Sequence, residues 1–139
     1  MTERPFQVEN LDHVVVRVAD VDRALGFYRD VLGCVPARIV ERLGLHQLRA
    51  GRSMIDLIDA KGPLGDDRQG RNMDHFAIRI EPFDAAAIRA YLARHGIAAG
   101  EPEPRYGAEG TGPSIYITDP DGNIVELKGP PDDAAAGSD

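Results

Sequence analysis

The sequence predicts an α+β fold made of two similar modules, each with the order β-α-β-β-β. The first observation is an internal repeat: the segment LDHVVVRV at 11–18 returns 62 positions later as MDHFAIRI at 73–80. Apolar, Asp, His and Arg positions keep their register between the two copies. The second observation is that each copy reads as a strand that leads into a segment with helical spacing, and three strand-like pieces follow each helix.

The first module is expected at about 9–60. Asp20 is suited to cap a helix that ends at Gly33, and the apolar positions of that helix are Val21, Ala24, Leu25, Tyr28 and Leu32. Strands are expected at about 35–42, 45–50 and 53–58.

The second module is expected at about 73–129. Asp84 can cap its helix and Gly96 can end it, with an apolar stripe of Ile88, Tyr91 and Leu92. Strands are predicted weakly at 97–99 and more clearly at 114–118 and 123–128. The sequence Asp119-Pro120-Asp121-Gly122 suits a type I turn, which predicts a hairpin between the last two strands.

The whole chain is expected to form a single domain over 9–130, because 139 residues leave room for one ordinary domain. The Gly-, Pro- and Asp-rich stretch at 61–72 is the expected joint between the modules. Residues 131–139 offer little to bury and are expected to be a disordered tail.

Composition excludes several classes of function. The formal net charge is −7 and the basic residues are scattered, so we expect no nucleic-acid partner. The nearest basic patch, Arg68 with Arg71, shares its loop with Asp66 and Asp67 and indicates a solvated surface. No apolar run approaches the ~20 residues of a membrane helix, and no leader is visible, so a cytoplasmic protein without membrane contact is expected.

Cys34 is the only cysteine, which excludes an intrachain disulfide and a thiolate metal cluster. A metal ion would have to be held by nitrogen and oxygen. His13 and His75 are candidates because they occupy equivalent strand positions in the two copies. Glu126 is a third, since Val125 and Leu127 form the apolar face of its strand and leave the carboxylate on the other. Asp56 is the position symmetric to Glu126.

Two imidazoles and one or two carboxylates suit Fe(II), Mn, Ni, Co or Zn. A cation with open positions can hold two neighbouring substrate oxygens and stabilise the negative charge that develops there. Asp56 or Glu126 could then move protons. The alternative is that each histidine is a hydrogen-bonded core residue.

Other polar side chains have two interpretations each. Tyr116 could donate a hydrogen bond to a developing oxyanion, or be a half-buried strand aromatic. Arg17 and Arg79 lie on the faces that carry the histidines and could hold a substrate carboxylate or pair with acidic residues at the rim. Arg105, next to Tyr106 in a Gly-rich stretch, is expected in a mobile loop that contacts substrate.

The strings LDHVVVRVADVDRALGFYRDVLG, MDHFAIRI and SIYITDPDGNIVELKGP together resemble the vicinal-oxygen-chelate superfamily. The resemblance covers about 9–130, and its most specific part is Asp-Pro-Asp-Gly-Asn followed by two apolar residues and Glu. It implies paired βαβββ modules whose eight strands form a U-shaped mixed sheet around a metal ion held by His13, His75 and Glu126. In similar small family members the modules of two chains combine, which implies a homodimer where His13 of one chain meets His75 and Glu126 of the other.

The family includes glyoxalase I, extradiol dioxygenases, fosfomycin-modifying enzymes and bleomycin-binding proteins. Glyoxalase-like members use four ligands, and the second would here be Asp56, which is one methylene shorter than the usual glutamate. An extradiol dioxygenase would use Tyr116 but needs an acid-base histidine, which 51–60 lacks and His46 precedes. We expect a glyoxalase-like lyase or isomerase acting on a small oxygen-rich metabolite, with an extradiol-type dioxygenase or a non-catalytic, drug-sequestering binding protein as alternatives.

Overall fold

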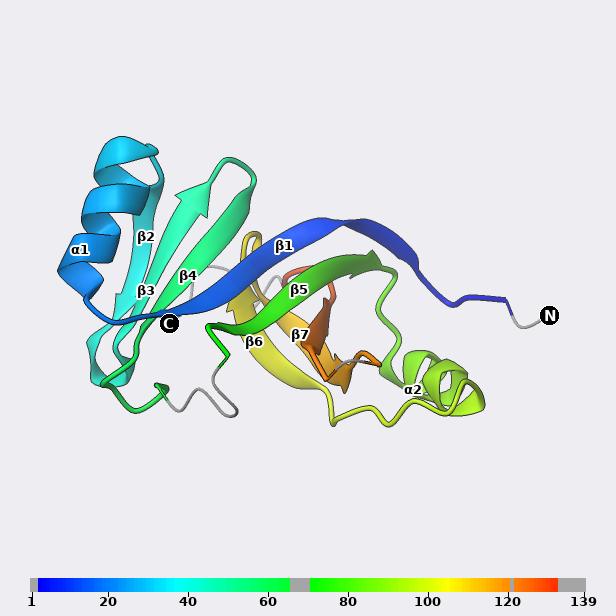
Figure 1. The fold of residues 1–139 in the computed structure, drawn as a ribbon. Helices are drawn as coiled ribbons and strands as arrows, with labels where there is room; N and C mark the ends of the chain where they lie inside the picture. Colours follow the sequence, from blue (N-terminus) through cyan, green and yellow to red (C-terminus); the bar gives the residue numbers. More distant parts are fainter. Residues whose placement is uncertain (1–2, 66–70, 121, 133–139) are drawn as a thin grey trace. The chain divides into compact units, whose positions relative to one another are not determined.

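The computed structural model describes residues 3–65, 71–120 and 122–132 (Figure 1). The elements of the first repeat are β1 (Gln7–Val18), α1 (Val21–Leu25), the π-helix η1 (Gly26–Val31), β2 (Val35–Val40), the 3-10 helix η2 (Glu41–Leu43), β3 (Leu45–Ala50) and β4 (Ser53–Asp59). Those of the second are β5 (Met73–Glu81), α2 (Ala85–Arg94), β6 (Glu103–Gly107), β7 (Gly110–Thr118) and β8 (Ile124–Lys128). The predicted α+β class and the double βαβββ order are confirmed.

The eight strands form a mixed sheet in the order β2-β3-β4-β1-β5-β8-β7-β6. The chain divides into two compact units, one of Met1–Asp12 with Phe76–Asp139 and one of His13–His75. The predicted joint at 61–72, the loop of Arg68 and the tail fall wholly or partly on residues outside the described ranges.

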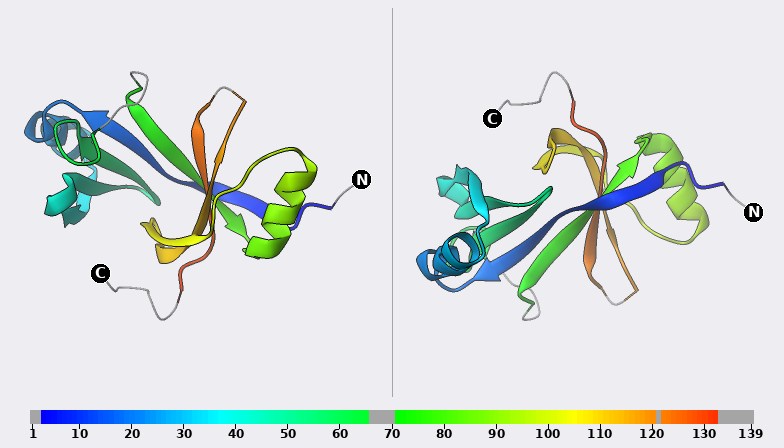
Figure 2. Two further views of the ribbon diagram at one scale, coloured as in Figure 1. Left: turned by 90° about the horizontal axis from the view of Figure 1, so that it is seen from below. Right: turned by 90° about the horizontal axis from the view of Figure 1, so that it is seen from above.

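In the unit His13–His75, β1 pairs with β4 in parallel and places Val15 opposite Asp56, while β3 pairs antiparallel with β4 and β2. Asp20 caps α1 as predicted, because its carboxylate accepts a hydrogen bond from the Arg23 amide at 3.0 Å. The expected continuous α-helix changes to a π-helix after five residues, with the Leu32 amide bonded to the Phe27 carbonyl. Both views of Figure 2 show the helical segment beside the strands β2–β4.

The two outer strands of the sheet carry prolines. In β2, the register with β3 shifts between Pro36 and Arg38, which marks a bulge. In β6, Pro104 lies opposite Pro113 of β7. The sequence-based expectation of a strand at 97–99 is wrong, and the strand lies at Glu103–Gly107 instead. Its composition hides it because Pro and Gly disfavour strands, except at an edge where a missing amide hydrogen is tolerated.

The other unit has an apolar core on one face of β5, β8 and β7. Asp84 caps α2 through the Ala87 amide at 3.1 Å, and Ile88 and Leu92 point into this core as predicted. Both views of Figure 2 show this helix beside β5. The buried residues of the cluster are Phe6, Ile80, Ile88, Leu92, Ile115, Val125 and Leu127. Because strand side chains alternate, the opposite face is left for Ala77, Glu126 and Lys128.

The predicted hairpin before the last strand is confirmed. β7 and β8 pair antiparallel, and the Gly122 amide donates to the Asp119 carbonyl at 3.0 Å. The Asn123 amide also donates to the Asp119 carboxylate at 2.8 Å. Asp121 lies outside the described residues, so the type I geometry stays a prediction. The turn fixes the register that brings Glu126 beside Tyr116.

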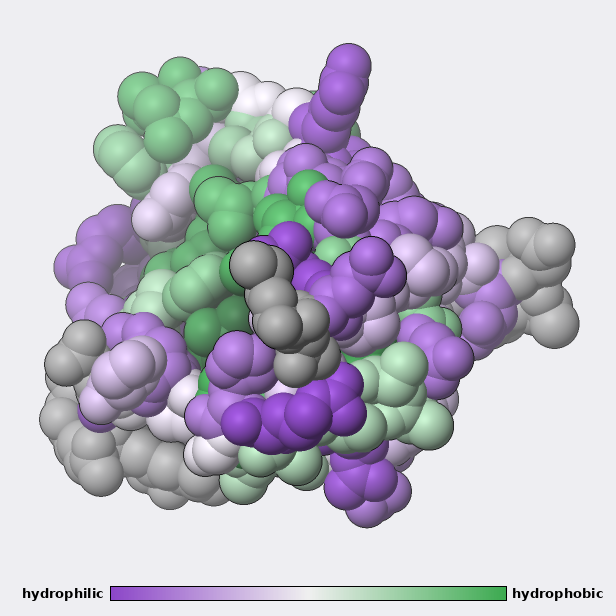
Figure 3. Space-filling model, turned by 90° about the vertical axis from the view of Figure 1, so that its right-hand side faces the viewer, coloured by the Kyte–Doolittle hydropathy of each residue, from purple (hydrophilic) through white to green (hydrophobic). Residues whose placement is uncertain are grey.

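Some large apolar side chains remain at the surface, as the green atoms on the face drawn in Figure 3 illustrate. Those more than half exposed are Val8, Leu11, Phe27, Val31, Leu32, Val35 and Ile39. Among the described residues, none of the helices has the length and apolar character needed to cross a bilayer.

We expect Leu92→Ala to destabilise the protein by about 2–5 kcal/mol, because it leaves a cavity where a side chain only 4% exposed now packs. The measurement is the free energy of unfolding from urea titration. Val31→Ala is the control, since Val31 is 72% exposed and its truncation should change that free energy by less than about 1 kcal/mol. Equal losses in the two variants would contradict the assigned core.

Candidate metal centre

The two repeated histidines meet within the unit His13–His75. Their Nε2 atoms lie 3.3 Å apart, and the rings are nearly perpendicular with centroids 5.4 Å apart. Both rings are buried, with His13 5% and His75 8% exposed. Two nitrogens that each bind one cation at about 2.0–2.1 Å would lie roughly 3.0–3.4 Å apart. The observed spacing therefore fits two ligands of one metal ion.

Both rings belong to one chain. Their pairing does not need the expected exchange of ligands between two chains, and the homodimer stays a prediction.

Asp74 fixes the orientation of His75. Its carboxylate accepts a hydrogen bond from His75 Nδ1 at 2.8 Å, which leaves Nε2 with a lone pair for a metal. The hydrogen bond from His75 holds the pKa of Asp74 below its ordinary value, against the effect of partial burial. Arg17 donates to the same carboxylate and to the Arg71 carbonyl. Asp74 was not among the predicted site residues, although the Asp-His pair of the repeat carries that signal.

Glu126 is buried in β8, with 1% of its surface exposed. It lies opposite Ala77 of β5 on one side and Tyr116 of β7 on the other. Since His75 precedes Ala77 by two residues in the same strand, alternation puts His75 and Glu126 on the same face.

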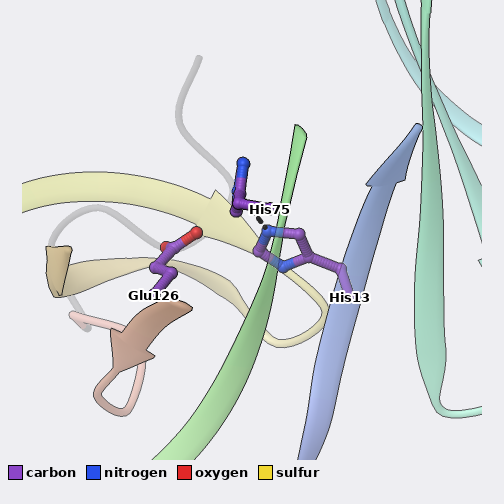
Figure 4. Close-up of side chains that lie close together, drawn as sticks. All are labelled: His13, His75 and Glu126. Atoms are coloured by element: carbon purple, nitrogen blue, oxygen red, sulfur yellow. Dashed lines mark hydrogen bonds between the residues drawn. The ribbon is translucent and has the colours of Figure 1, made fainter. Parts of the chain in front are cut away.

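Figure 4 draws the three side chains, and one possible ligand atom from each lies within 4.8 Å of the others. All three are buried. Among the described residues, His13, His75 and Glu126 are the His, Cys, Asp and Glu side chains that come close enough together to hold a metal ion. Asp56 does not belong to this group. Two nitrogens and one carboxylate oxygen suit a divalent transition metal, which the donor set and its burial both fit.

Asp56 lies on the face that carries His13, because it is opposite Val15, two residues further along β1. The carboxylate is 4% exposed and accepts a hydrogen bond from Gln47 Nε2 at 3.0 Å. The Gln47 amide oxygen in turn accepts from Arg38 at 2.8 Å. This chain of hydrogen bonds from Arg38 through the buried Gln47 to the buried Asp56 orients the carboxylate. Neither Gln47 nor Arg38 is predicted as a site residue from the sequence.

Tyr116 and Arg105 lie together on the Glu126 side of the other unit. The Arg105 guanidinium stacks over the Tyr116 ring at 4.1 Å from its centroid, a cation–π contact. It also donates to Ser114 Oγ at 2.7 Å. Arg105 lies in β6, so the expectation that a loop carries it is wrong. The strand and the aromatic ring hold the guanidinium over Tyr116, which lies opposite Glu126 in the β7–β8 pairing.

Arg17 and Arg79 both make ion pairs. Arg17 pairs with Asp74. Arg79 donates to Glu109 at 2.7 Å and to Glu81 at 2.8 Å. Burial acts to lower the pKa of Arg79, but these two carboxylates outweigh it and raise that pKa. Of the two interpretations of these arginines, pairing with acidic residues is the one that the structure shows.

Lys128 is a further buried charge on this face, at 1% exposure. Burial lowers the pKa of its ammonium, while the nearby carboxylates of Glu126 and Asp12 act in the opposite direction. The sequence shows Lys128 on the Glu126 face but does not predict its burial.

The sequence profile of the Glyoxalase/Bleomycin resistance protein/Dioxygenase superfamily matches residues 10–127. The glyoxalase domain-containing protein RDO1 of Mycosarcoma maydis is 29% identical over 136 residues, which cover 90% of this chain and 70% of that protein. A probable lactoylglutathione lyase of Vibrio cholerae is 31% identical, over 83% of this chain and 86% of its own length. The crystal structure of methylmalonyl-CoA epimerase from Mycobacterium tuberculosis matches with a TM-score of 0.65 at 25% identity and covers 91% of both chains.

Other relatives bear the names of different enzymes. They include a catechol-2,3-dioxygenase of Bacillus subtilis, of which this chain spans 40%, and a metallothiol transferase of Shouchella clausii. Relatives of this chain therefore include an epimerase, a lyase, a dioxygenase and a transferase. The chain belongs to the glyoxalase/bleomycin resistance protein/dioxygenase superfamily, which is the vicinal-oxygen-chelate family that its repeat and its Asp-Pro-Asp-Gly-Asn motif resemble.

Proposed function

We propose that this chain is a divalent-metal-dependent enzyme, a glyoxalase-like lyase or isomerase that acts on a small oxygen-rich metabolite. His13, His75 and Glu126 would hold the metal ion. The observation that carries the proposal is the buried cluster of their ligand atoms, within 4.8 Å of one another. Two imidazole nitrogens and one carboxylate oxygen at this spacing are a donor set that divalent transition metals prefer, which favours a metal centre over a packing role.

Bound there, a cation such as Fe(II), Mn, Ni, Co or Zn would draw negative charge toward the substrate oxygens. The chain's own residues supply the rest. Asp56 is suited to remove and return a proton, because its carboxylate shares the His13 face and Gln47 fixes its orientation at 3.0 Å. Proton transfer at a carbon next to a carbonyl is the step that lyases and isomerases of this kind share.

Tyr116 and Arg105 support a substrate that carries negative charge. Tyr116 lies next to Glu126 and can donate its hydroxyl proton to an oxygen on which charge develops. Arg105 stacks on that ring and offers a guanidinium suited to a carboxylate. A 2-oxo acid or 2-hydroxy acid has both the neighbouring oxygens and the charge.

A dioxygenase of the extradiol type is less well supported. Such an enzyme needs an acid-base histidine near the metal. His46 lies opposite Leu57 in the β3–β4 pairing, whereas its neighbour Gln47 lies opposite Asp56. Because neighbouring residues of a strand face opposite sides, His46 points away from the face of Asp56 and His13.

We expect the purified protein to contain about one divalent metal ion per chain, and His13→Ala or Glu126→Gln to lose it, because two ligands hold a cation far more weakly than three. Elemental analysis of the freshly purified proteins measures the metal. His95→Gln is the matched control, since His95 follows α2 and stacks on Tyr91. Metal-free wild-type protein that gains no thermal stability from added Zn²⁺ or Co²⁺ would instead support a binding protein without a metal.

Arg105→Met should weaken the binding of pyruvate to the Co²⁺-loaded protein by about 10- to 100-fold, the usual range for a lost hydrogen bond to a charged group. Binding of neutral hydroxyacetone should be unchanged. Binding in both titrations is measured from changes in the absorption spectrum of the bound Co²⁺. Arg94→Met, in the last turn of α2, is the control. Equal weakening of the two ligands would exclude Arg105 as the group that recognises the carboxylate.

A further inference from the structure

Lys128 ends β8 on the face that carries Glu126, two residues earlier in the strand. An ammonium that is 1% exposed costs several kcal/mol unless charged or polar partners surround it. Lys128 Nζ donates to the Arg105 carbonyl at 2.6 Å and lies 3.5 Å from the Gly112 carbonyl. Arg105 and Gly112 are direct partners in the β6–β7 pairing, so the ammonium joins the last strand to both strands of that hairpin.

Asp12 meets the end of the Lys128 side chain over the backbone of Gly107. A methyl group on Gly107 would lie 2.2 Å from Lys128 Cε and 2.4 Å from Asp12 Oδ2, so the two side chains crowd the same point. Asp12 is also 1% exposed, and its Oδ2 accepts a hydrogen bond from the Ala108 amide at 2.9 Å. These two buried side chains of opposite charge, named here the Asp12–Lys128 pair, can come this close only because residue 107 is a glycine.

The two residues of the pair are close in sequence to two of the proposed metal ligands. Asp12 is the residue before His13, and Lys128 follows Glu126 by two positions. The Arg105 carbonyl that Lys128 holds belongs to the residue whose guanidinium stacks on Tyr116. Neither Asp12 nor Lys128 is one of the proposed ligands, so the effect of the pair on the centre would act through the strands that it fixes.

We propose that the Asp12–Lys128 pair is a positioning element that holds the Glu126 strand and the start of the His13 segment in metal-binding geometry. The inference rests on the proposed metal centre and deepens it. The Lys128 ammonium also offsets negative charge of the nearby Glu126 and Asp12 carboxylates. A pair that served stability alone would affect unfolding without a specific effect on the metal.

The test compares Lys128→Met, Asp12→Asn and the conservative Lys128→Arg with a control of similar thermal destabilisation, Leu92→Ala on the opposite face. Co²⁺ titration of the metal-free proteins gives the dissociation constant and the visible spectrum of the bound ion. We expect Lys128→Met and Asp12→Asn to weaken Co²⁺ binding by about 10- to 100-fold, the range found when groups behind metal ligands are lost. Leu92→Ala should change the dissociation constant by less than twofold, and Lys128→Arg should recover part of the loss.

The possible outcomes separate the positioning role of the pair from the metal centre itself. If Lys128→Met and Asp12→Asn bind Co²⁺ as Leu92→Ala does at matched melting temperature, the positioning role is wrong while the metal centre stands. If the wild-type protein binds no Co²⁺, or binds it equally after His13→Ala and Glu126→Gln, the proposed function fails first and this inference with it. Should Lys128→Met not fold, as judged by circular dichroism, Asp12→Asn decides the question, because it keeps the shape of the side chain and removes only its charge.

Discussion

The parallel register between β5 and β8 is the constraint on which the proposed centre depends. It sets Glu126 opposite Ala77, on the face that His75 shares. A shift of one residue would turn the Glu126 carboxylate into the apolar core under α2, and would bring Val125 and Leu127 out of it. The cost of burying an unpaired charge and the loss of apolar burial act in the same direction. Hydrophobic packing on one face of the sheet thus fixes the polar chemistry on the other.

Both copies of the internal repeat pair their first and last strands in the same register. Val15 lies opposite Asp56 in one unit, and Ala77 lies opposite Glu126 in the other. The surroundings then differ: a glutamine amide holds Asp56, whereas Glu126 has a tyrosine as its neighbour on the next strand. Two positions that the repeat makes equivalent can therefore take different roles, one as a proton-transfer group and the other as a ligand.

The sequence predicts those parts of the structure that local periodicity determines. The two histidines recur in register, and alternation in the last strand predicts the face of Glu126, so both follow from neighbours along the chain. The strand Glu103–Gly107 does not, because its residues disfavour strands and only pairing with β7 makes one. The partners of Gln47 and Lys128 were not predictable for the same reason, since strands distant in sequence bring them together.

The prolines of the outer strands affect the tendency of the protein to aggregate at high concentration. An exposed strand edge can recruit an edge of another chain through its free amide and carbonyl groups, which is a common route to aggregation. Pro36 and the bulge beside it in β2, and Pro104 in β6, interrupt that pattern at both ends of the strand order. Growth of the sheet by adding strands from a neighbouring molecule is therefore disfavoured, and self-association would have to use side chains instead of backbone hydrogen bonds.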